Sequence, residues 1–255
     1  MKVKDKVVVV TGGASGIGRA LARRFARDGA RCVIVADRDA AGAQAVAKEI
    51  GGIGEALDVS VEEAVASLIE RTEANVAPID LFCSNAGIGI GRGLEAPNDV
   101  WQKIWEVNLM SHVYAARHLV PRMVKRGGGY LLNTASAAGL LSQIGSATYA
   151  VTKHAAVALA EWIAITHGHE GIKVSVLCPQ AVRTAMTAGN EGGVASVDGM
   201  IEADEVAEVV TQALDEERFL VLPHPQVAEY MRRKATDYDR WLRGMRRLAE
   251  GYRQT

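Results

Sequence analysis

The sequence predicts an α/β fold in which a doubly wound parallel sheet carries helices on both faces. Short apolar runs alternate with longer helical stretches, the runs are apolar almost throughout, and a glycine-rich turn follows the first of them. Continuous hydrophobicity is typical of parallel strands that are covered on both faces. At 255 residues the chain lies within the range of one large α/β domain, so we expect a single domain over residues 1–255.

Each apolar run is taken as a strand. The expected strands are Val7–Val10, Cys32–Ala36, Gly54–Leu57, Ile79–Ser84, Tyr130–Thr134, Lys173–Leu177 and Phe219–Leu222. Between them, the pattern predicts a helix over Arg19–Arg27 and a long apolar helix from Tyr149 to about His167. Gly87–Pro97 is glycine-rich and follows a strand, so it could border a site. Ala185–Met200 lacks periodicity, and we interpret it as a mobile lid rather than a plain exposed loop.

Beyond the last strand, apolar residues recur at steps of three or four from Val227 to Tyr252, with arginines mostly between them. This spacing predicts an extra amphipathic, basic C-terminal helix, a helical extension over residues 226–252. Several acidic residues dilute its charge. We therefore favour docking on its own body or on a sister subunit over a membrane or nucleic-acid role.

Composition narrows the functional classes further. The formal net charge of -1 provides no basic field for nucleic acid. Val7–Val10 is too short for a signal peptide or a membrane span, so we expect a cytoplasmic protein without membrane attachment. Cys32, Cys83 and Cys178 are widely spaced and odd in number, which indicates buried, reduced thiols. Histidines, cysteines and acids show no ligand spacing, and we expect no metal site. A small neutral substrate fits best.

A glycine-rich turn joins the first strand to the first helix. It reads Thr11-Gly12-Gly13-Ala14-Ser15-Gly16-Ile17-Gly18. Gly12 permits the tight turn, Gly16 lets backbone N–H groups approach a pyrophosphate, and Gly18 allows close packing of helix on strand. With a strand before it, a helix after it and an acid 19 residues on, the motif predicts a Rossmann-type dinucleotide site.

That acid, Asp37, follows the second strand and indicates which dinucleotide binds. Its carboxylate could accept hydrogen bonds from the adenosine ribose hydroxyls and would repel a 2'-phosphate. Ser15 offers no compensating positive charge beside the second glycine. We therefore predict NAD over NADP, although the guanidinium of Arg38 could reach a 2'-phosphate and leaves NADP possible.

Tyr149 and Lys153 lie four residues apart and so share one face of the long helix. An ammonium beside a phenol stabilises the phenolate and lowers the pKa of the phenol from about 10, toward a range suited to proton transfer. The pair alone is a weak signal, because many helices carry Tyr and Lys at this spacing.

Taken together, these motifs resemble the short-chain dehydrogenase/reductase family over roughly Lys6 to Leu222. Further matches are Asn85-Ala86-Gly87 after the fourth strand, Val107-Asn108-Leu109 on the next helix, Ser136 placed 13 residues before Tyr149, and Asp58-Val59 where the family contacts adenine. The resemblance implies an oxidoreductase that interconverts a secondary alcohol and a ketone by hydride transfer with NAD, and a homodimer or homotetramer.

The resemblance also implies roles for individual residues. Ser136 would bind the substrate oxygen, Tyr149 would transfer the proton, and Lys153 would hold the nicotinamide ribose and tune Tyr149. Asn108 would anchor a water that relays the proton, and Thr184 would meet the carboxamide. The implied cofactor-binding residues are Gly12, Ser15, Gly16, Ile17, Gly18, Asp37, Arg38, Asp58, Val59, Asn85, Ala86, Gly87, Tyr149, Lys153, Pro179, Val182 and Thr184.

Two features depart from the family pattern. Gln180 follows Pro179 where the family usually has glycine, so its role is open, and the basic C-terminal helix is extra, which puts the usual subunit packing in doubt. A hydrophobic substrate is expected, because a set of apolar residues could surround the reacting carbon: Leu140, Leu141, Ile144, Met186 and Met200. Alternatives are an NADPH-dependent ketoreductase of the 3-oxoacyl type and a catalytically silent dinucleotide sensor.

Overall fold

The computed structural model describes residues 1–189 and 192–253, in which seven strands form one parallel sheet of order β3-β2-β1-β4-β5-β6-β7. The strands are β1 (Val7–Thr11), β2 (Cys32–Asp37), β3 (Ile53–Ala56), β4 (Leu81–Ser84), β5 (Gly129–Thr134), β6 (Ile172–Leu177) and β7 (Leu220–Val221). All seven expected strands are confirmed. The expected strands Ile79–Ser84 and Phe219–Leu222 are each shorter by two residues, and Pro223 cannot donate a backbone hydrogen bond to extend the second of them.

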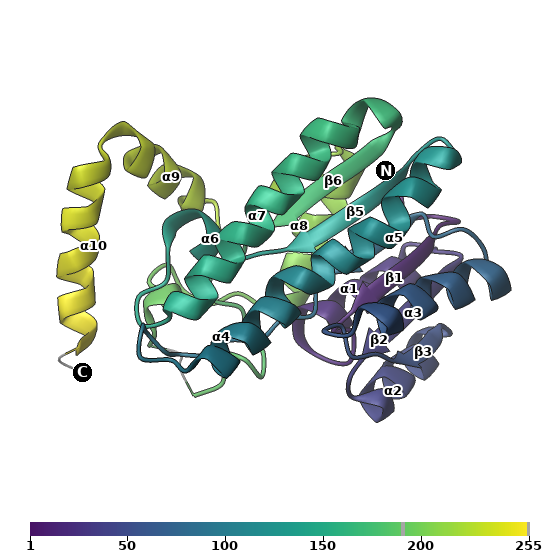
Figure 1. The fold of residues 1–255 in the computed structure, drawn as a ribbon, viewed down its shortest axis with the longest axis horizontal. Helices are drawn as coiled ribbons and strands as arrows, with labels where there is room; N and C mark the ends of the chain where they lie inside the picture. The colour runs from purple at the N-terminus through teal and green to yellow at the C-terminus, as the bar shows by residue number, and fades with distance from the viewer. Residues whose placement is uncertain (190–191, 254–255) are drawn as a thin grey trace.

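Helices connect the strands and extend the chain beyond them (Figure 1). They are α1 (Gly16–Arg27), α2 (Ala40–Ile50), α3 (Glu62–Asn75), α4 (Asn98–Trp105), α5 (Ser111–Lys125), α6 (Ala138–Leu141), α7 (Ala147–His167), α8 (Ala203–Asp215), α9 (Gln226–Thr236) and α10 (Tyr238–Arg253). Three short helical segments are η1 (Glu106–Met110, π-helical), η2 (Gly168–Glu170) and η3 (Val194–Ser196).

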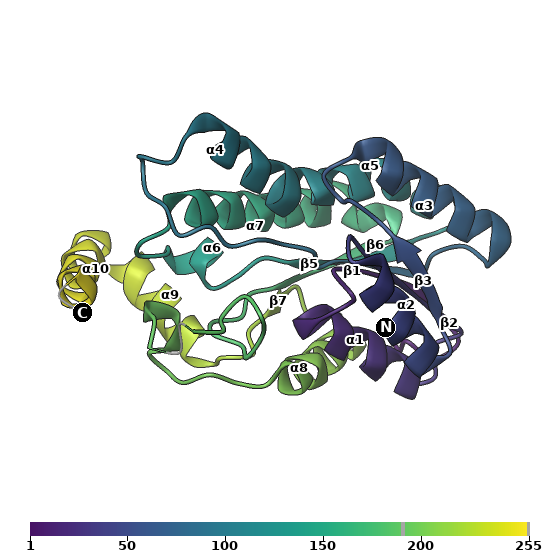
Figure 2. The same cartoon turned by 90° about the horizontal axis from the view of Figure 1, so that it is seen from below.

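The helices cover both faces of the sheet, as the apolar strands predict. In Figure 2, α3, α5 and α7 lie on one face, and α1, α2 and α8 lie on the other. The two large clusters of buried apolar residues divide in the same way, one beneath α3, α5 and α7 and the other beneath α1, α2 and α8. The strand order reverses between β1 and β4, which is where an open α/β sheet forms a ligand-binding crevice at its carboxyl edge.

The C-terminal extension consists of two helices, α9 and α10, rather than the one predicted. The helix α9 ends at Asp237, where the backbone is extended, with φ and ψ of -148° and 93°. Asp237 then begins the next helix, because its carboxylate accepts the N–H of Arg240 at 2.9 Å. In both views α10 stands apart from the sheet and lies beside α9 (Figures 1 and 2). We call α9 and α10 together the C-terminal arm.

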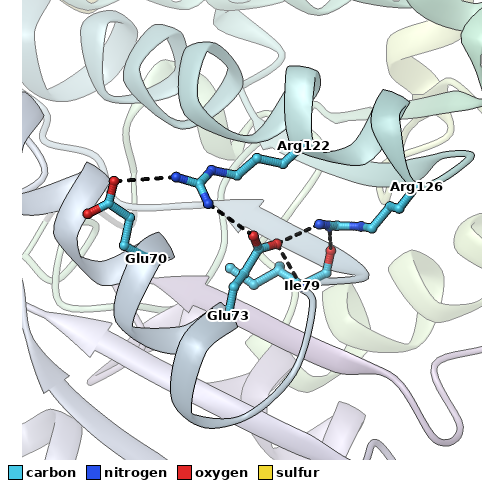
Figure 3. Close-up of polar contacts among 5 residues, drawn as sticks. All are labelled: Glu70, Glu73, Ile79, Arg122 and Arg126. Atoms are coloured by element: carbon cyan, nitrogen blue, oxygen red, sulfur yellow. Dashed lines mark hydrogen bonds and ion pairs between the residues drawn. The ribbon is translucent and has the colours of Figure 1, made fainter.

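An ion-pair network joins α3 to α5 on the outer side of the sheet (Figure 3). Glu73 lies between two guanidinium groups, 3.4 Å from Arg122 and 2.6 Å from Arg126, and Arg122 also reaches Glu70 at 3.3 Å. Glu73 accepts the Ile79 N–H at 3.2 Å as well. The network therefore ties two helices to the start of β4.

The expectations for the cysteines and for the loop Ala185–Met200 are met only in part. The cysteines are free, and Cys83 and Cys178 are buried, but Cys32 at the start of β2 is only partly buried. In the predicted lid, η3 interrupts the loop, and residues 190–191 lie outside the described part of the chain. Its mobility stays a prediction. Among the described residues, no helix is long and apolar enough to cross a membrane.

Candidate active site

A cleft of about 1710 Å³ runs along the carboxyl edge of the sheet and on to the C-terminal arm. Every predicted cofactor-binding residue lines it, as do Ser136, Tyr149 and Lys153. Among the predicted site residues, only Asn108 does not. The fold therefore brings together motifs that lie up to 172 residues apart in the chain, from Gly12 to Thr184.

The glycine-rich turn needs glycine for two different reasons. Gly12 and Gly16 have φ of +66° and +50°, a region that side chains disfavour. At Gly18 the reason is contact, because a Cβ there would collide with the Gly12 carbonyl and lie 2.6 Å from Nδ2 of Asn85. The N-terminus of α1 thus opens directly onto the cleft, where its free N–H groups favour an anion.

Asp37 is held at the end of β2 by the backbone of two neighbouring loops. Its carboxylate accepts the Ala14 N–H and the Asp39 N–H, both at 3.0 Å. Asp58 lies further along the same wall, where hydrogen bonds from Ser60 lower the pKa of its carboxyl group and the nearby charge of Arg38 adds to this. Two fixed carboxylates therefore border this end of the cleft.

Asn85 joins the ends of three strands, and one of its partners, Thr11, was not predicted as a site residue. Its N–H donates to the Thr11 hydroxyl at 3.0 Å, its Nδ2 donates to the Thr11 carbonyl at 3.0 Å, and its Oδ1 accepts the Thr134 hydroxyl at 3.2 Å. The Thr11 hydroxyl in turn donates to the Cys83 carbonyl. Only its position directly before Gly12 marks Thr11 in the sequence.

Asn108 lies in the π-helical segment η1 and is fully buried. Its Oδ1 accepts the Ile88 N–H at 2.8 Å, and its Nδ2 donates to the Ile88 carbonyl at 2.9 Å and to the Thr152 hydroxyl at 3.3 Å. The side-chain amide therefore fastens the loop after β4 and has its hydrogen-bonding groups occupied by protein atoms. It is a positioning group in this geometry rather than part of the cleft wall.

Ser136, Tyr149 and Lys153 meet where β5 and α7 converge. The Ser136 hydroxyl accepts the Ala138 N–H at 3.1 Å and donates to the Pro179 carbonyl at 3.4 Å. Lys153 donates to the Thr134 carbonyl at 3.0 Å, and its Nζ lies 5.7 Å from the centre of the Tyr149 ring. The expected pairing of phenol and ammonium on one helical face is thus present.

The protonation of this group differs from the expectation. Burial raises the pKa of Tyr149, and a hydrogen bond with Ser136 lowers it in part. Burial also lowers the pKa of Lys153 to about 8. The predicted lowering of the Tyr149 pKa by Lys153 is therefore wrong for the protein alone. Desolvation is the largest influence on the Tyr149 pKa, and the Lys153 ammonium donates to the Thr134 carbonyl rather than to the phenol.

Gln180 lines the cleft, and its backbone bonds His224, a residue that the sequence did not single out. The Gln180 N–H donates to Nδ1 of His224 at 3.2 Å, and His224 is buried just after β7. Burial lowers the pKa of His224, so its imidazole is held as a neutral acceptor. Its place between Pro223 and Pro225 gave no chemical signal.

The apolar part of the cleft only partly matches its prediction. Leu141, Ile144 and Met186 line it, whereas Leu140 and Met200 do not. Leu140 packs into the core instead, because the single turn of α6 directs neighbouring residues to different sides. The C-terminal arm supplies further apolar lining that was not predicted: Trp241, Met245 and Leu248.

Comparison with known proteins agrees with this geometry. The family model described as short chain dehydrogenase matches residues 6–193. A 1-deoxy-11-beta-hydroxypentalenate dehydrogenase from Streptomyces exfoliatus is 37% identical over 233 residues, which cover 86% of this chain and 83% of that protein. A meso-2,3-butanediol dehydrogenase from Serratia marcescens is 34% identical, over 74% of this chain and 76% of that protein.

Among solved structures, a short chain dehydrogenase/reductase from Burkholderia phymatum in complex with NAD superposes with a TM-score of 0.85. The two chains are 28% identical, and the match covers 94% of this chain and 96% of the other. The family model alone spans more than half of the sequence. The chain therefore belongs to the short-chain dehydrogenase family.

Proposed function

We propose that this protein is an NAD(P)-dependent oxidoreductase that interconverts a secondary alcohol and a ketone, with NAD favoured. The observation that carries the proposal is the meeting of Ser136, Tyr149 and Lys153 in the same cleft as the glycine-rich turn and Asp37. The dehydrogenase names of the relatives support this reaction class. The substrate is a small molecule.

The residues of the cleft fit a dinucleotide. Gly12 and Gly16 adopt conformations that only glycine accepts easily, and they bring backbone N–H groups to the N-terminus of α1, where a pyrophosphate would bind. Asp37, fixed by two N–H donors, is placed to accept the ribose hydroxyls. Asp58 and Val59 would flank the adenine, and Thr184 would meet the carboxamide.

A nicotinamide held by the cofactor-binding residues would supply the acceptor for the hydride of the carbinol carbon. In the oxidation direction, Ser136 holds the substrate oxygen, and Tyr149 removes the hydroxyl proton through its phenolate oxygen. Because burial raises the pKa of Tyr149, the phenolate needs positive charge nearby, which Lys153 and the oxidised cofactor supply. Asn108 positions the Ile88 loop beside them, and any water it anchors would be held by its backbone.

A substrate screen tests the proposal. Secondary alcohols of increasing apolar size are incubated with NAD, and the absorbance of the reduced nicotinamide is followed. We expect turnover that Tyr149→Phe lowers by at least about a hundredfold, within the range measured for removal of a general acid/base. Tyr114→Phe serves as the control, since Tyr114 bonds Glu106 outside the cleft. Equal turnover by wild type and Tyr149→Phe would contradict the proposed proton transfer.

Cofactor choice is tested separately. Titration with NADH and NADPH should show tighter binding of NADH, and Asp37→Ala should reduce that preference by about tenfold, because the variant removes the charge that repels a 2'-phosphate. Tighter NADPH binding by wild type would favour the 3-oxoacyl ketoreductase alternative. Binding without turnover of any alcohol or ketone would favour the silent dinucleotide sensor.

We further propose a cytoplasmic homo-oligomer, a dimer or tetramer, with one domain over 1–255. Support comes from α7, where Val151, Trp162 and Ile165 expose apolar side chains on one face at helical spacing. Light scattering should give a mass above that of one 27.2 kDa chain, and Trp162→Glu should shift it toward the monomer. A monomeric wild type would refute this part.

A further inference from the structure

The C-terminal arm contributes charge as well as apolar surface to the cleft that contains Tyr149. The charged side chains of the arm that line it are Glu229, Arg232, Arg233, Asp237, Arg240 and Arg247. Arginine is suited to binding planar anions because its guanidinium presents several N–H donors in one plane. What matters is which of these arginines already has a partner.

Two of them do. The Glu229 carboxylate lies 2.6 Å from Arg232 and 2.9 Å from Arg233, so both guanidiniums already have a carboxylate partner, although the three side chains together keep one net positive charge. Arg240 and Arg247 have no carboxylate within ion-pair distance among the residues that the structure describes. The other acid, Asp237, bonds the backbone N–H of Arg240 instead of its guanidinium. Within the described part of the chain, two exposed guanidinium groups therefore border the cleft without a carboxylate partner.

The spacing along α10 places these charges beside an apolar strip. Arg240 and Arg247 are seven residues apart, two helical turns along one side. Gly244 lies between the two arginines on the same side of the helix and has no side chain. The nearest atom to the position that a Cβ of Gly244 would occupy is Nη2 of Arg247, at 4.0 Å. Trp241 and Met245 line the cleft next to them. The helix thus presents an apolar surface edged by positive charge.

We infer that the substrate is an amphipathic hydroxy or keto acid, with the reacting carbon at Tyr149 and a carboxylate at the opposite end held by Arg240 and Arg247. Its apolar body would rest on Trp241 and Met245. This inference rests on the proposed function, narrows its substrate class, and replaces the neutral substrate expected from composition with an acid. The cleft of about 1710 Å³ includes the dinucleotide site, and it continues past Tyr149 to the apolar side chains of the arm, where an extended or polycyclic acid would lie.

Binding measurements test the inference with two pairs of probes: 3α-hydroxycholanoate and 12-hydroxyoctadecanoate, each with its uncharged methyl ester. The protein is loaded with NADH, so that the hydroxy probes are not oxidised during the titration, and tryptophan fluorescence reports each Kd. Because both guanidiniums are exposed, each should strengthen acid binding only about two- to fivefold. The double variant Arg240→Gln/Arg247→Gln should weaken acid binding by about tenfold and leave ester binding unchanged.

Arg243→Gln/Arg246→Gln is the matched control, because these arginines lie on α10 but do not line the cleft. It should change neither Kd. Equal effects of the two double variants, no preference of wild type for acid over ester, or no binding of either acid would overturn the inference. Competition by inorganic phosphate as strong as by the acids would also overturn it, since the site would then suit a phosphate group.

The same probes separate this inference from the proposed function. In Tyr149→Phe, acid binding should persist while turnover is lost. Tyrosine-dependent turnover of neutral alcohols without any acid preference would overturn only the substrate class. Acid binding that depends on Arg240 and Arg247, with no alcohol or ketone turned over by wild type, would instead refute the proposed reaction.

Discussion

The two ends of the cleft differ in how their polar side chains are satisfied. At the inner end, Asp37, Asn85 and Lys153 all bond backbone groups at the ends of the strands or in the adjoining loops. At the outer end, on the arm, Arg240 and Arg247 have no carboxylate partner within the described part of the chain. The inner groups are fixed before a ligand arrives, whereas the outer ones can still pair with one.

This difference separates the residues of the cleft that would take part in the reaction from those that would only bind the substrate. Groups held by the backbone keep one geometry, which proton and hydride transfer require. Exposed guanidiniums can adjust to a ligand, so they contribute modest binding energy and tolerate change. Substitutions at the inner end should therefore have large effects, and substitutions on the arm should have small ones.

The largest effect is expected for Lys153→Met. Loss of the ammonium removes the charge that favours the Tyr149 phenolate, and turnover should fall by about 10²- to 10⁴-fold. Lys234→Met on the arm is the control, since Lys234 also donates to a backbone carbonyl, that of Leu140 at 2.7 Å. Initial rates with NAD compare them, and similar losses in both variants would contradict the distinction between the ends.

The next prediction concerns His112, which is buried behind the inner end and bonds Asn133 at 3.1 Å. Burial, together with the charge of Lys153, lowers the pKa of His112 to about 3. Between pH 6.5 and 3 the unfolded chain binds a proton that the folded chain does not. The free energy of unfolding should therefore fall with falling pH, by up to about 1.4 kcal/mol for each pH unit from this group.

Denaturant unfolding of wild type and His112→Gln at several pH values measures this. Glutamine keeps a hydrogen-bonding group for Asn133 but does not titrate, so the variant should lose less stability than wild type as the pH falls below 6.5. Parallel curves for the two proteins would show that His112 is not held neutral.

Alanine substitutions of Gly18 and Gly244 compare how tightly the inner and outer ends of the cleft are packed. Gly18→Ala places a methyl group against the Gly12 carbonyl and Asn85, and should lower the free energy of unfolding by about 1–3 kcal/mol. Gly244→Ala has room on α10 and should stabilise that helix by about 0.5–1 kcal/mol, which slower amide exchange in α10 would report. Equal tolerance at both positions would contradict the close approach at Gly18.

The smallest effect is expected in the network of Figure 3, where arginines do have partners. Glu73→Gln removes a mostly buried carboxylate shared by Arg122 and Arg126, and should lower the free energy of unfolding by about 1 kcal/mol. Glu70→Gln, at a more exposed carboxylate, should cost less. Urea unfolding measures the free energy of unfolding of both variants. A loss of stability in Glu70→Gln as large as in Glu73→Gln would contradict this ranking.

Sequence reasoning succeeded where function is tied to strand ends. Gly12, Asp37 and Ser136 each follow or end an apolar run, so the parallel sheet itself brings them to one edge. The spacing of Tyr149 and Lys153 within one helix was equally readable. The position of these residues along the cleft was therefore predictable, whereas the contribution of Trp241, Met245 and Leu248 on the arm was not.

What the sequence could not give depends on tertiary contacts. The break at Asp237 interrupts a continuous apolar period, so periodicity predicted one helix where there are two. The bonds of Thr11 and His224 form with partners 74 and 44 residues away. The pKa of Tyr149 was mispredicted because burial of the phenol is invisible in local spacing.

Isotope transfer would show whether hydride passes from the substrate to the nicotinamide. A secondary alcohol that the protein turns over is deuterated at the carbinol carbon and incubated with NAD, and the nicotinamide product is analysed by mass spectrometry. We expect that one deuterium moves to the nicotinamide ring and that the rate falls at least about a hundredfold in Tyr149→Phe. Oxidation of the alcohol without deuterium in the nicotinamide would contradict it.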